Sequence, residues 1–547
     1  MTWQDYADKH TNTPVVLVEI AFNSGTRYYS ADYVRTSAQI YKGNILSLPE
    51  IYSSLGSLER KFERNVVNIL FSDVDYEFRG LEESESPGLN KRTVTIKVAF
   101  EDDDYATPET VFTGEIFDWR RLDGLQFEIF IRSSSENEAA LYPDKLITTT
   151  DYPSADSAVI GLPIPIPYGS PSNLGLTNDG CVPCYMVDTT QDAEVSIVGL
   201  GTAAITVNRV YINGTLKTLT THYTVSTSVV DGKTHTLINW VAAVRPIASD
   251  EVTADLTFGT RRPVEAVRHI HENHFTETGS YNATSYTDAT GKEAARGYAF
   301  DGVMLEQKTR REWEDQWRAE FEVDIYRNKA NEICFNYLSG ILPATINSYN
   351  EKTDILEGFD SDPQVQEIIN YIDYFWDFDY YRANYKTSAV YEDTTSQTKH
   401  GGIYKPREGG MYFQFIRSSL TALDIVSRKL IRFKNPIVID KMTFPLKCFS
   451  DGLTDVVKIT HFLGGGASGY SDVKFQIREQ TFDLDRFVVV LTLEDVTGFM
   501  GRGCKLGDPA VIPELWTSAT TAEQEYCYMC DTDNEFSNND PGKQLID

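Results

Sequence analysis

The sequence predicts a multidomain protein that is mainly β, with a mixed α and β middle. Its 547 residues are too many for one hydrophobic core and imply several domains. The composition is 41% hydrophobic and 12% aromatic, which is typical of folded protein rather than of disordered chain. Apolar and polar residues alternate at both ends of the chain, as in residues 93–100 and 473–478. A period of two is the period of half-buried strands.

Residues 1–150 are predicted to form a first β-barrel. Short apolar stretches separated by polar turns fill residues 14–133. Strands of this length and spacing are typical of a closed barrel or a sandwich.

Residues 151–190 are predicted to be a connector without regular structure, because proline and glycine are dense there. A small inserted β domain is expected over residues 191–262. Within it the Asn213-Gly214 pair favours a tight turn between two strands.

Residues 263–410 are predicted to be a mixed α/β domain. Its first helix begins at Pro263, where a missing N–H does no harm, and places Val264, Val267 and Ile270 on one face. A charged second helix is expected within residues 301–323, followed by a hairpin of residues 321–326 and 332–337.

Residues 411–500 are predicted to be a helix followed by a second β-barrel. The helix should span residues 413–433 and bury a stripe of Ile416, Leu420, Leu423 and Leu430. Strands are then expected at 437–439, 456–460, 473–478 and 487–494. A C-terminal extension, residues 501–547, completes the chain.

An internal comparison links the two ends. Residues 111–116, a turn at 123–124 and residues 125–131 parallel residues 474–478, a turn at 483–486 and residues 487–493. The likeness concerns architecture more than identity, and it predicts two related barrels in one chain.

Two stretches resemble a known family. One is the run Ile160-Gly-Leu-Pro-Ile-Pro-Ile-Pro-Tyr-Gly169. The other comprises Pro445-Leu446, the strand at 453–461, the glycine-rich loop ending at residues 469–471 and the final hairpin. Both resemble phage tail hub proteins, the central baseplate hubs of contractile-tail phages and their relatives in siphophages and gene transfer agents.

The resemblance implies a structural virion protein at the distal end of the tail, made in the host cytoplasm. A homotrimer would present six similar barrels, so that a threefold tip or central fibre could join a sixfold tail tube. The implied partners are the distal tail protein, the tail tube protein, the tape measure protein and the tail tip or central fibre protein. Such a hub would also gate the DNA channel.

DNA is expected only in transit. The net charge of −30 opposes tight binding to phosphates, which requires lysine and arginine. No run of about 18 apolar residues is present, so no membrane insertion is predicted.

An aromatic stretch over residues 371–391 is the candidate interface. Aromatic clusters bury large areas at protein contacts, and they also line sugar-binding clefts. The proposed interface residues are Tyr374, Phe375, Trp376, Phe378, Tyr380 and Tyr381.

Two C-x2-C pairs, Cys181 with Cys184 and Cys527 with Cys530, are the candidate metal ligands. Such pairs hold zinc or an iron–sulfur cluster. Over 340 residues separate the pairs, so buried structural cysteines are the competing interpretation and no cofactor is the main expectation. His271 and His274 lack zinc-protease spacing, and we expect them on a solvated helix face.

The chain is not predicted to be an enzyme, because it has no serine nucleophile motif and the glycine-rich loop at 464–469 lacks a phosphate-binding lysine. Two alternatives remain open. One is a phage-associated enzyme that degrades cell wall or capsule through a carboxylate pair. The other is a receptor- or carbohydrate-binding tail fibre subunit.

Overall fold

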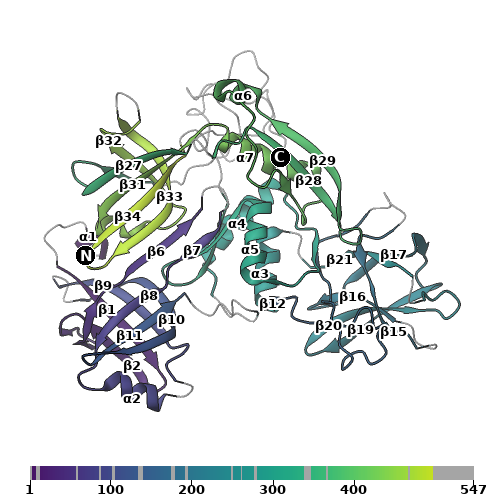
Figure 1. Cartoon of the computed structure of the whole chain (residues 1–547), viewed down its shortest axis with the longest axis horizontal. Coiled ribbons are helices and arrows are strands. Elements are labelled where there is room, and N and C mark those ends of the chain that lie inside the picture. The colour runs from purple at the N-terminus through teal and green to yellow at the C-terminus, as the bar shows by residue number, and fades with distance from the viewer. Residues whose placement is uncertain are drawn as a thin grey trace.

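The computed structural model describes residues 3–7, 13–56, 60–85, 88–101, 105–106, 108–133, 140–173, 179–190, 195–247, 250–259, 262–275, 280–337, 346–364, 367–465 and 469–496. Within these residues the protein is mainly β and is built from several sheets. Figure 1 shows two large sheets on one side, three helices in the middle and a small β domain on the other side. None of the described helices is long and apolar enough to cross a membrane.

The first large sheet has nine strands in the order β3-β4-β2-β1-β9-β10-β11-β8-β5. Its strands are β1 (Pro14–Phe22), β2 (Gly25–Ser30), β3 (Val34–Arg35), β4 (Ile40–Gly43), β5 (Ile45–Ser47), β8 (Val67–Ser72), β9 (Thr93–Phe100), β10 (Glu109–Leu122) and β11 (Gln126–Arg132). Val94, Ile96 and Val98 of β9 are fully buried, which confirms the predicted alternation. The short helices α1 (Trp3–Ala7) and α2 (Glu77–Ser84) pack against this sheet's core.

The second large sheet runs β26-β32-β33-β34-β31-β27, and β33 also pairs with β6, which pairs in turn with β7. The strands are β6 (Glu50–Leu55), β7 (Phe62–Arg64), β26 (Asn347–Asn350), β27 (Glu357–Gln364), β31 (Ile437–Pro445), β32 (Val456–His461), β33 (Tyr470–Asp483) and β34 (Val488–Asp495). All four strands predicted between residues 437 and 494 are present.

Four strands of each sheet share one topology. In the first, β8 is followed by a helix, α2, and then by β9, β10 and β11. In the second, β31 is followed by a 3-10 helix, η3 (Leu446–Ser450), and then by β32, β33 and β34. The spatial orders β9-β10-β11-β8 and β32-β33-β34-β31 correspond, and the second strand of each order, β10 or β33, has 14 residues. The internal comparison made on the sequence is confirmed at this level.

The predicted boundaries of the two barrels need correction. Strands β6 and β7 fall within residues 1–150 but pair in the second sheet, and β26 and β27 fall within 263–410 but belong to the second sheet as well. Alternation shows that a segment is a strand, but it does not show which strand lies beside it. The second sheet therefore takes strands from segments that the sequence assigns to other domains.

The middle contains the helices α3 (Pro263–Asn273), α4 (Ala283–Arg296) and α5 (Arg310–Phe321), and the hairpin of β24 (Val323–Arg327) and β25 (Ile333–Tyr337). Proline begins α3 as predicted. A capping box of Thr309 and Glu312 begins α5, and its Trp313 and Trp317 are buried. The sequence analysis did not predict α4, because its exposed face carries small residues and only Ala289 and Glu293 are buried.

The small β domain has two four-stranded sheets. One is β14-β21-β17-β18, with β14 (Val182–Pro183), β17 (Thr206–Ile212), β18 (Thr215–Lys217) and β21 (Val252–Thr257). The other is β15-β16-β20-β19, with β15 (Tyr185–Asp188), β16 (Val195–Gly201), β19 (Tyr223–Val230) and β20 (Lys233–Trp240). The domain therefore begins before the predicted residue 191. Asn213 and Gly214 have φ of 47° and 76° and form the predicted tight turn.

The connector is more ordered than expected. It contains β13 (Ile166–Tyr168), which pairs with β22 (Gly302–Met304), and Tyr168 is fully buried. A shorter pair, β12 (Leu141–Tyr142) and β23 (Lys308–Thr309), ties the preceding segment to α5. The prolines interrupt the alternation of apolar and polar residues, but they do not prevent a three-residue strand, because β13 pairs along only one edge.

A three-stranded sheet, β29-β28-β30, covers the helix α7 (Ser419–Phe433). Its strands are β28 (Tyr371–Asp379), β29 (Asn384–Glu392) and β30 (Met411–Tyr412), and α6 (Thr394–His400) follows β29. The helix α7 begins at Ser419, not at residue 413, because the Ser418 side chain caps it. Leu420 and Leu423, expected in the core, are 54% and 38% exposed.

Gly169 tests the packing of the connector. Its φ is +66°, and a Cβ there would collide with the Phe300 carbonyl and the Asp301 carboxylate. In the same connector Gly161 has φ +88° and open space around it. We expect Gly161→Ala to cost about 1 kcal/mol of conformational strain and Gly169→Ala to cost several times more. Thermal unfolding of both variants measures this, and equal losses would contradict the packing described.

Candidate functional site: the junction of the two large sheets

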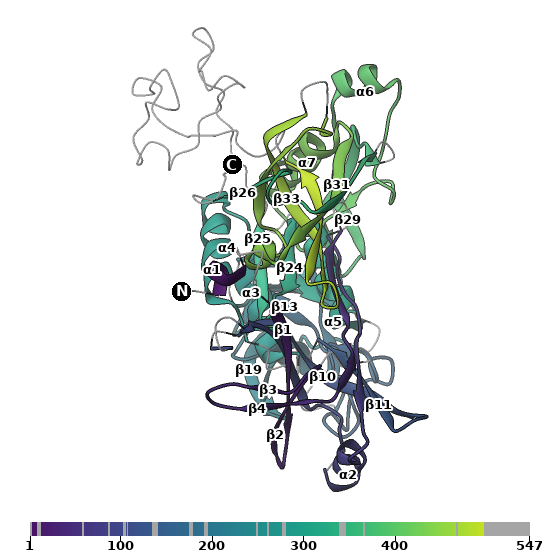
Figure 2. The same ribbon diagram turned by 90° about the vertical axis from the view of Figure 1, so that its left-hand side faces the viewer.

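The N-terminal helix joins the two large sheets. The indole Nε1 of Trp3 donates to the carbonyl of Val98 in the first sheet at 3.0 Å. The same ring lies 4.5 Å from the ring of Phe449 in η3, measured between centroids. One continuous apolar cluster therefore runs through both sheets. Figure 2 shows the first sheet below the second.

A β-arm makes the second connection. Strand β6 leaves the first sheet and pairs with β33 over five residues, from Ser54 opposite Glu479 to Glu50 opposite Asp483. Strand β7 returns beside it. Because β33 is a long strand of the second sheet, the arm fixes the position of the chain that leads back to β8 of the first sheet.

A buried ionic cluster ties the β-arm to the middle domain and to the second sheet. It consists of Arg60, Glu322, Asp324, Lys429, Arg432, Arg478 and Glu494. Arg60 precedes β7, and its Nη1 lies 3.0 Å from Asp324 of β24. It also donates to the Glu322 carbonyl at 2.8 Å. Arg60 is 2% exposed and the Asp324 side chain is fully buried.

Glu494 of β34 is the second centre of this cluster. Its carboxylate accepts from Arg478 Nε and from Arg432 Nε, both at 2.7 Å. Burial alone would raise the pKa of Glu494, but the two guanidinium groups lower it to about 2. Charge-assisted bonds of this kind are stronger than neutral ones. The cluster thus joins the β-arm, the hairpin, α7 and the second sheet.

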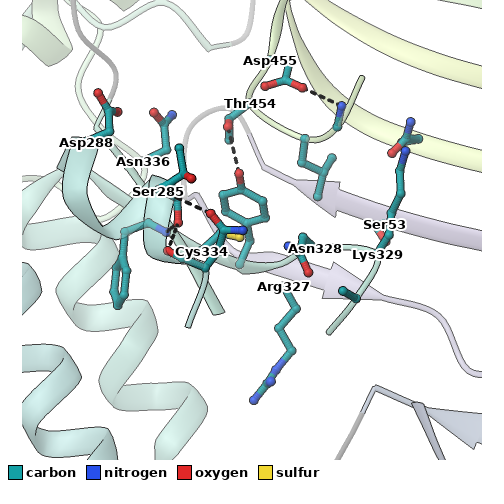
Figure 3. Close-up of a pocket in the computed structure, with 18 of the residues that line it drawn as sticks. Ser53, Ser285, Asp288, Arg327, Asn328, Lys329, Cys334, Asn336, Thr454 and Asp455 are labelled. Atoms are coloured by element: carbon teal, nitrogen blue, oxygen red, sulfur yellow. Dashed lines mark hydrogen bonds between the residues drawn. The ribbon is translucent and has the colours of Figure 1, made fainter. Parts of the chain in front are cut away.

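A groove of about 1490 Å³ lies beside this junction. Figure 3 shows residues from α4, from the β24–β25 hairpin and from the loop before β32 around it. At the hairpin tip, Lys329 Nζ donates to the Phe449 carbonyl and lies 3.9 Å above the Phe449 ring. Burial lowers the pKa of Lys329 to about 8 and raises that of Asp455 to about 6.

The first cysteine pair is buried in the small β domain. Arg417 Nη1 donates to Cys181 Sγ at 3.0 Å, and the Cys184 thiol lies 3.9 Å from the Val182 carbonyl. Burial raises the pKa of both thiols, whereas a metal requires thiolates. Cys527 and Cys530 lie outside the described residues. Within those residues no group of three or more metal-ligating side chains occurs, and the zinc or iron–sulfur assignment stays a prediction.

The candidate interface residues do not form one surface. Tyr374 and Trp376 point from β28 into the chain's own core and are 5% and 8% exposed. Tyr380 is 6% exposed, and its hydroxyl donates to the Gln414 carbonyl at 2.7 Å. These three side chains stabilise the fold internally.

The other three candidate interface residues are partly accessible. Phe375, Phe378 and Tyr381 are half-buried. The Phe375 ring stacks on that of Tyr412 with centroids 5.0 Å apart, and Tyr412 is 47% exposed. A contact with another chain through this second face of β28 stays a prediction.

The histidines of α3 are not on a solvated face, which corrects the prediction. His271 and His274 are 1% and 4% exposed, because α3 packs between the connector and α5. His271 Nε2 lies 3.2 Å from Glu314 of α5. Burial lowers the pKa of His271 to about 4 and that of His274 to about 3.

The sequence analysis did not identify Trp3, Arg60 or the groove. Arg60 follows a short polar stretch and carries no motif. Its role arises from contacts with Glu322 and Asp324, which lie 262 and 264 residues away in the sequence, and no spacing within one segment could have indicated this.

Comparisons with known proteins give distant structural likenesses only. No protein-family model and no curated protein matches the chain. Its structural neighbours are phage tail proteins, at 8% or 9% identity.

Three of them illustrate this. The 43 kDa tail protein of prophage MuSo2 from Shewanella oneidensis has a TM-score of 0.40 and 9% identity, over 89% of this chain and 99% of its own. A chain of a native gene transfer agent virion has a TM-score of 0.41 and 9% identity, over 65% of this chain and 89% of its own. The tail protein from Neisseria meningitidis MC58 has a TM-score of 0.40 and 8% identity, over 88% of this chain and 98% of its own. Likenesses of this size assign no role to any residue.

The ionic cluster gives a stability prediction. Arg60→Met leaves Asp324 buried without its closest cation, which typically costs about 3–5 kcal/mol. The control is Arg121→Met, which breaks an exposed pair with Glu82 and should cost below about 1 kcal/mol. Denaturant unfolding followed by tryptophan fluorescence compares the two. An unchanged transition in Arg60→Met would show that the cluster does not hold the junction.

The buried histidines predict a loss of stability in acid. Each has a folded-state pKa below the unfolded value of about 6.5. Its contribution to the free energy of unfolding is therefore complete above pH 6.5 and falls as the pH drops towards 4. For His274 the loss from pH 7 to pH 5 is on the order of 2 kcal/mol. We expect His274→Phe to flatten the decline in melting temperature over this range. The control His400→Gln should keep it, and parallel curves for all three proteins would refute the assignment.

Proposed function

We propose that this protein is a structural subunit of a phage tail that serves as the tail hub. The observation that carries the proposal is the repeated topology of the two large sheets, held in one fixed arrangement by Trp3, the β-arm and the ionic cluster. A chain that presents the same unit twice can double the rotational symmetry of its own oligomer.

The proposed assembly is a homotrimer. Three copies would place six similar sheets around one axis, which matches a sixfold tail tube and distal tail ring on one side. The remaining parts of each copy would keep threefold symmetry for a tail tip or central fibre. The tape measure protein and the DNA would occupy the axis, and the subunit would gate that channel.

The role is mechanical rather than catalytic. The charged groups at the junction pair with one another inside the fold, where they stabilise the arrangement of the sheets. The aromatic residues Tyr374, Trp376 and Tyr380 lie in the chain's own core, whereas a carbohydrate-binding fibre would expose them. Both observations favour the hub over the enzyme and the fibre subunit.

Gold-labelled antibody tests the location. When antibody to this chain is applied to intact particles that contain it, we expect the gold label only at the end of the tail distal to the head. The control is antibody to a side fibre of the same particle. Label along the fibres, or no particle-bound label after mild disruption, would refute the hub.

Native mass spectrometry tests the oligomer. The chain has a mass of 61.7 kDa, so a trimer has three times that mass. We expect this species in the isolated protein or in disrupted tails, and Arg60→Met should reduce it by weakening the arrangement of the sheets. A monomer or dimer as the only species in disrupted tails would contradict the doubled-symmetry proposal.

A further inference from the structure

The groove beside the junction has the form of a binding site for a polypeptide segment. One wall is the exposed face of α4, which presents small side chains and Gly291. The opposite wall combines the β24–β25 hairpin with residues 449–456, which lead from η3 into β32. Figure 3 shows Ser285 and Asp288 on the helix facing Asn328 and Thr454. The volume of about 1490 Å³ exceeds that of ordinary small-molecule sites, which span about 300–1,000 Å³.

The groove is lined by the cations Arg64, Lys292, Arg327 and Lys329 and by the carboxylates Glu109, Asp288 and Asp455. The Nε and Nη1 atoms of Arg64 are buried without a hydrogen-bond partner in the part of the chain that the structure describes. Its guanidinium lies 4.7 Å above the Phe112 ring. Burial and the neighbouring Arg327 lower the pKa of Arg64 to about 10. Two adjacent like charges are costly in a buried site, so Arg64 favours a carboxylate ligand.

Two further buried groups in the groove lack partners. Gln476 is 1% exposed and its Oε1 accepts no hydrogen bond, and the hydroxyl of the fully buried Tyr337 forms none, within the described residues. Buried polar groups are nearly always satisfied in native proteins. A ligand that offers amide N–H groups together with carboxylates would satisfy the carbonyl of Gln476 and the cation of Arg64. An acidic polypeptide has both.

The chain itself contains such a segment. Residues 523–540 include six acidic side chains, Glu523, Glu525, Asp531, Asp533, Glu535 and Asp540, with three aromatic rings and no lysine or arginine. The described part of the chain ends at Val496, whose N–H donates to the Lys474 carbonyl at 3.0 Å. Lys474 lies two residues before Gln476 in β33. The 26 residues between Val496 and Glu523, at about 3.3 Å per residue when extended, are long enough to reach from Val496 to the part of the groove beside Gln476.

We propose that the groove binds the acidic segment 523–540 of this chain. Docked there, the segment would contact α4, the hairpin and the second sheet together and would lock the middle domain against that sheet. The proposal rests on the groove and on charge complementarity, and it does not require the assembly role proposed above.

Gly291 provides a way to block the groove without disturbing the fold. A Cβ added at Gly291 meets nothing within 4 Å, and glycine inside a helix is unfavourable relative to other residues. Gly291→Phe therefore keeps α4 intact while filling the groove. The matched control is Ala294→Phe, an exposed position of the same helix that does not line the groove. A second variant, Arg64→Met, removes the cation and keeps an apolar contact with Phe112.

Hydrogen–deuterium exchange of the full chain, read by mass spectrometry, gives the result. We expect amides of residues 523–540 to exchange at least tenfold faster in Gly291→Phe and faster in Arg64→Met, with wild-type rates in Ala294→Phe. Equal rates in all four proteins would overturn the proposal. So would a tenfold change in Ala294→Phe, because the effect would then not depend on the groove.

Zero-length cross-linking provides a second readout. Lys292 lines the groove, and a carbodiimide should join it to an acidic residue of 523–540. A mixture of isotopically labelled and unlabelled chains distinguishes docking within one copy from docking onto a neighbouring copy, and either result supports the site. Cross-links from residues 523–540 only to lysines outside the groove would refute it.

Discussion

The buried ionic cluster is the interaction on which the arrangement of the molecule depends. Its members come from the β-arm, the hairpin, α7 and the second sheet, and Asp324 and Glu494 are almost fully buried. Removing charges from water is expensive, and partial separation would leave ions buried without partners. The cluster therefore favours one complete arrangement over loosened ones. A hydrophobic contact of the same area would tolerate sliding, whereas paired guanidinium and carboxylate groups fix both distance and orientation.

This fixed arrangement gives the repeated topology its meaning. Two similar sheets on a flexible link would present two units at variable angles. Here Trp3 and the β-arm connect them at two separate places, and the ionic cluster fixes the arm against the hairpin, α7 and the second sheet. Strands β6 and β7 lie in the N-terminal part of the sequence, yet they pair in the second sheet. The two sheets are therefore not independent modules. A ring built from such chains inherits one spacing between its units, which is what a symmetric partner requires.

Local patterns in the sequence predicted many of the elements, although not α4 or β13, and they did not predict which elements lie side by side. Alternation identified β9 and the strands from β31 to β34, and Pro263 marked the start of α3. The same reasoning placed Leu420 and Leu423 in a core, because α7 has apolar residues on two faces and the sequence alone does not rank them. His271 and His274 were assigned to solvent because nothing local indicates that α5 covers them. Arg60 shows the limit most clearly, since its partners Glu322 and Asp324 lie 262 and 264 residues away in the sequence.

The central claim is that one chain supplies two equivalent units of a ring with doubled symmetry. Electron cryo-microscopy of the distal end of the tail tests it most directly, because it shows both copy number and the position of each sheet. The account predicts three copies whose six large sheets alternate around one axis against the tail tube, with the ionic cluster intact in each copy. Six copies, or three copies in which only one of the two sheets contacts the ring, would contradict it.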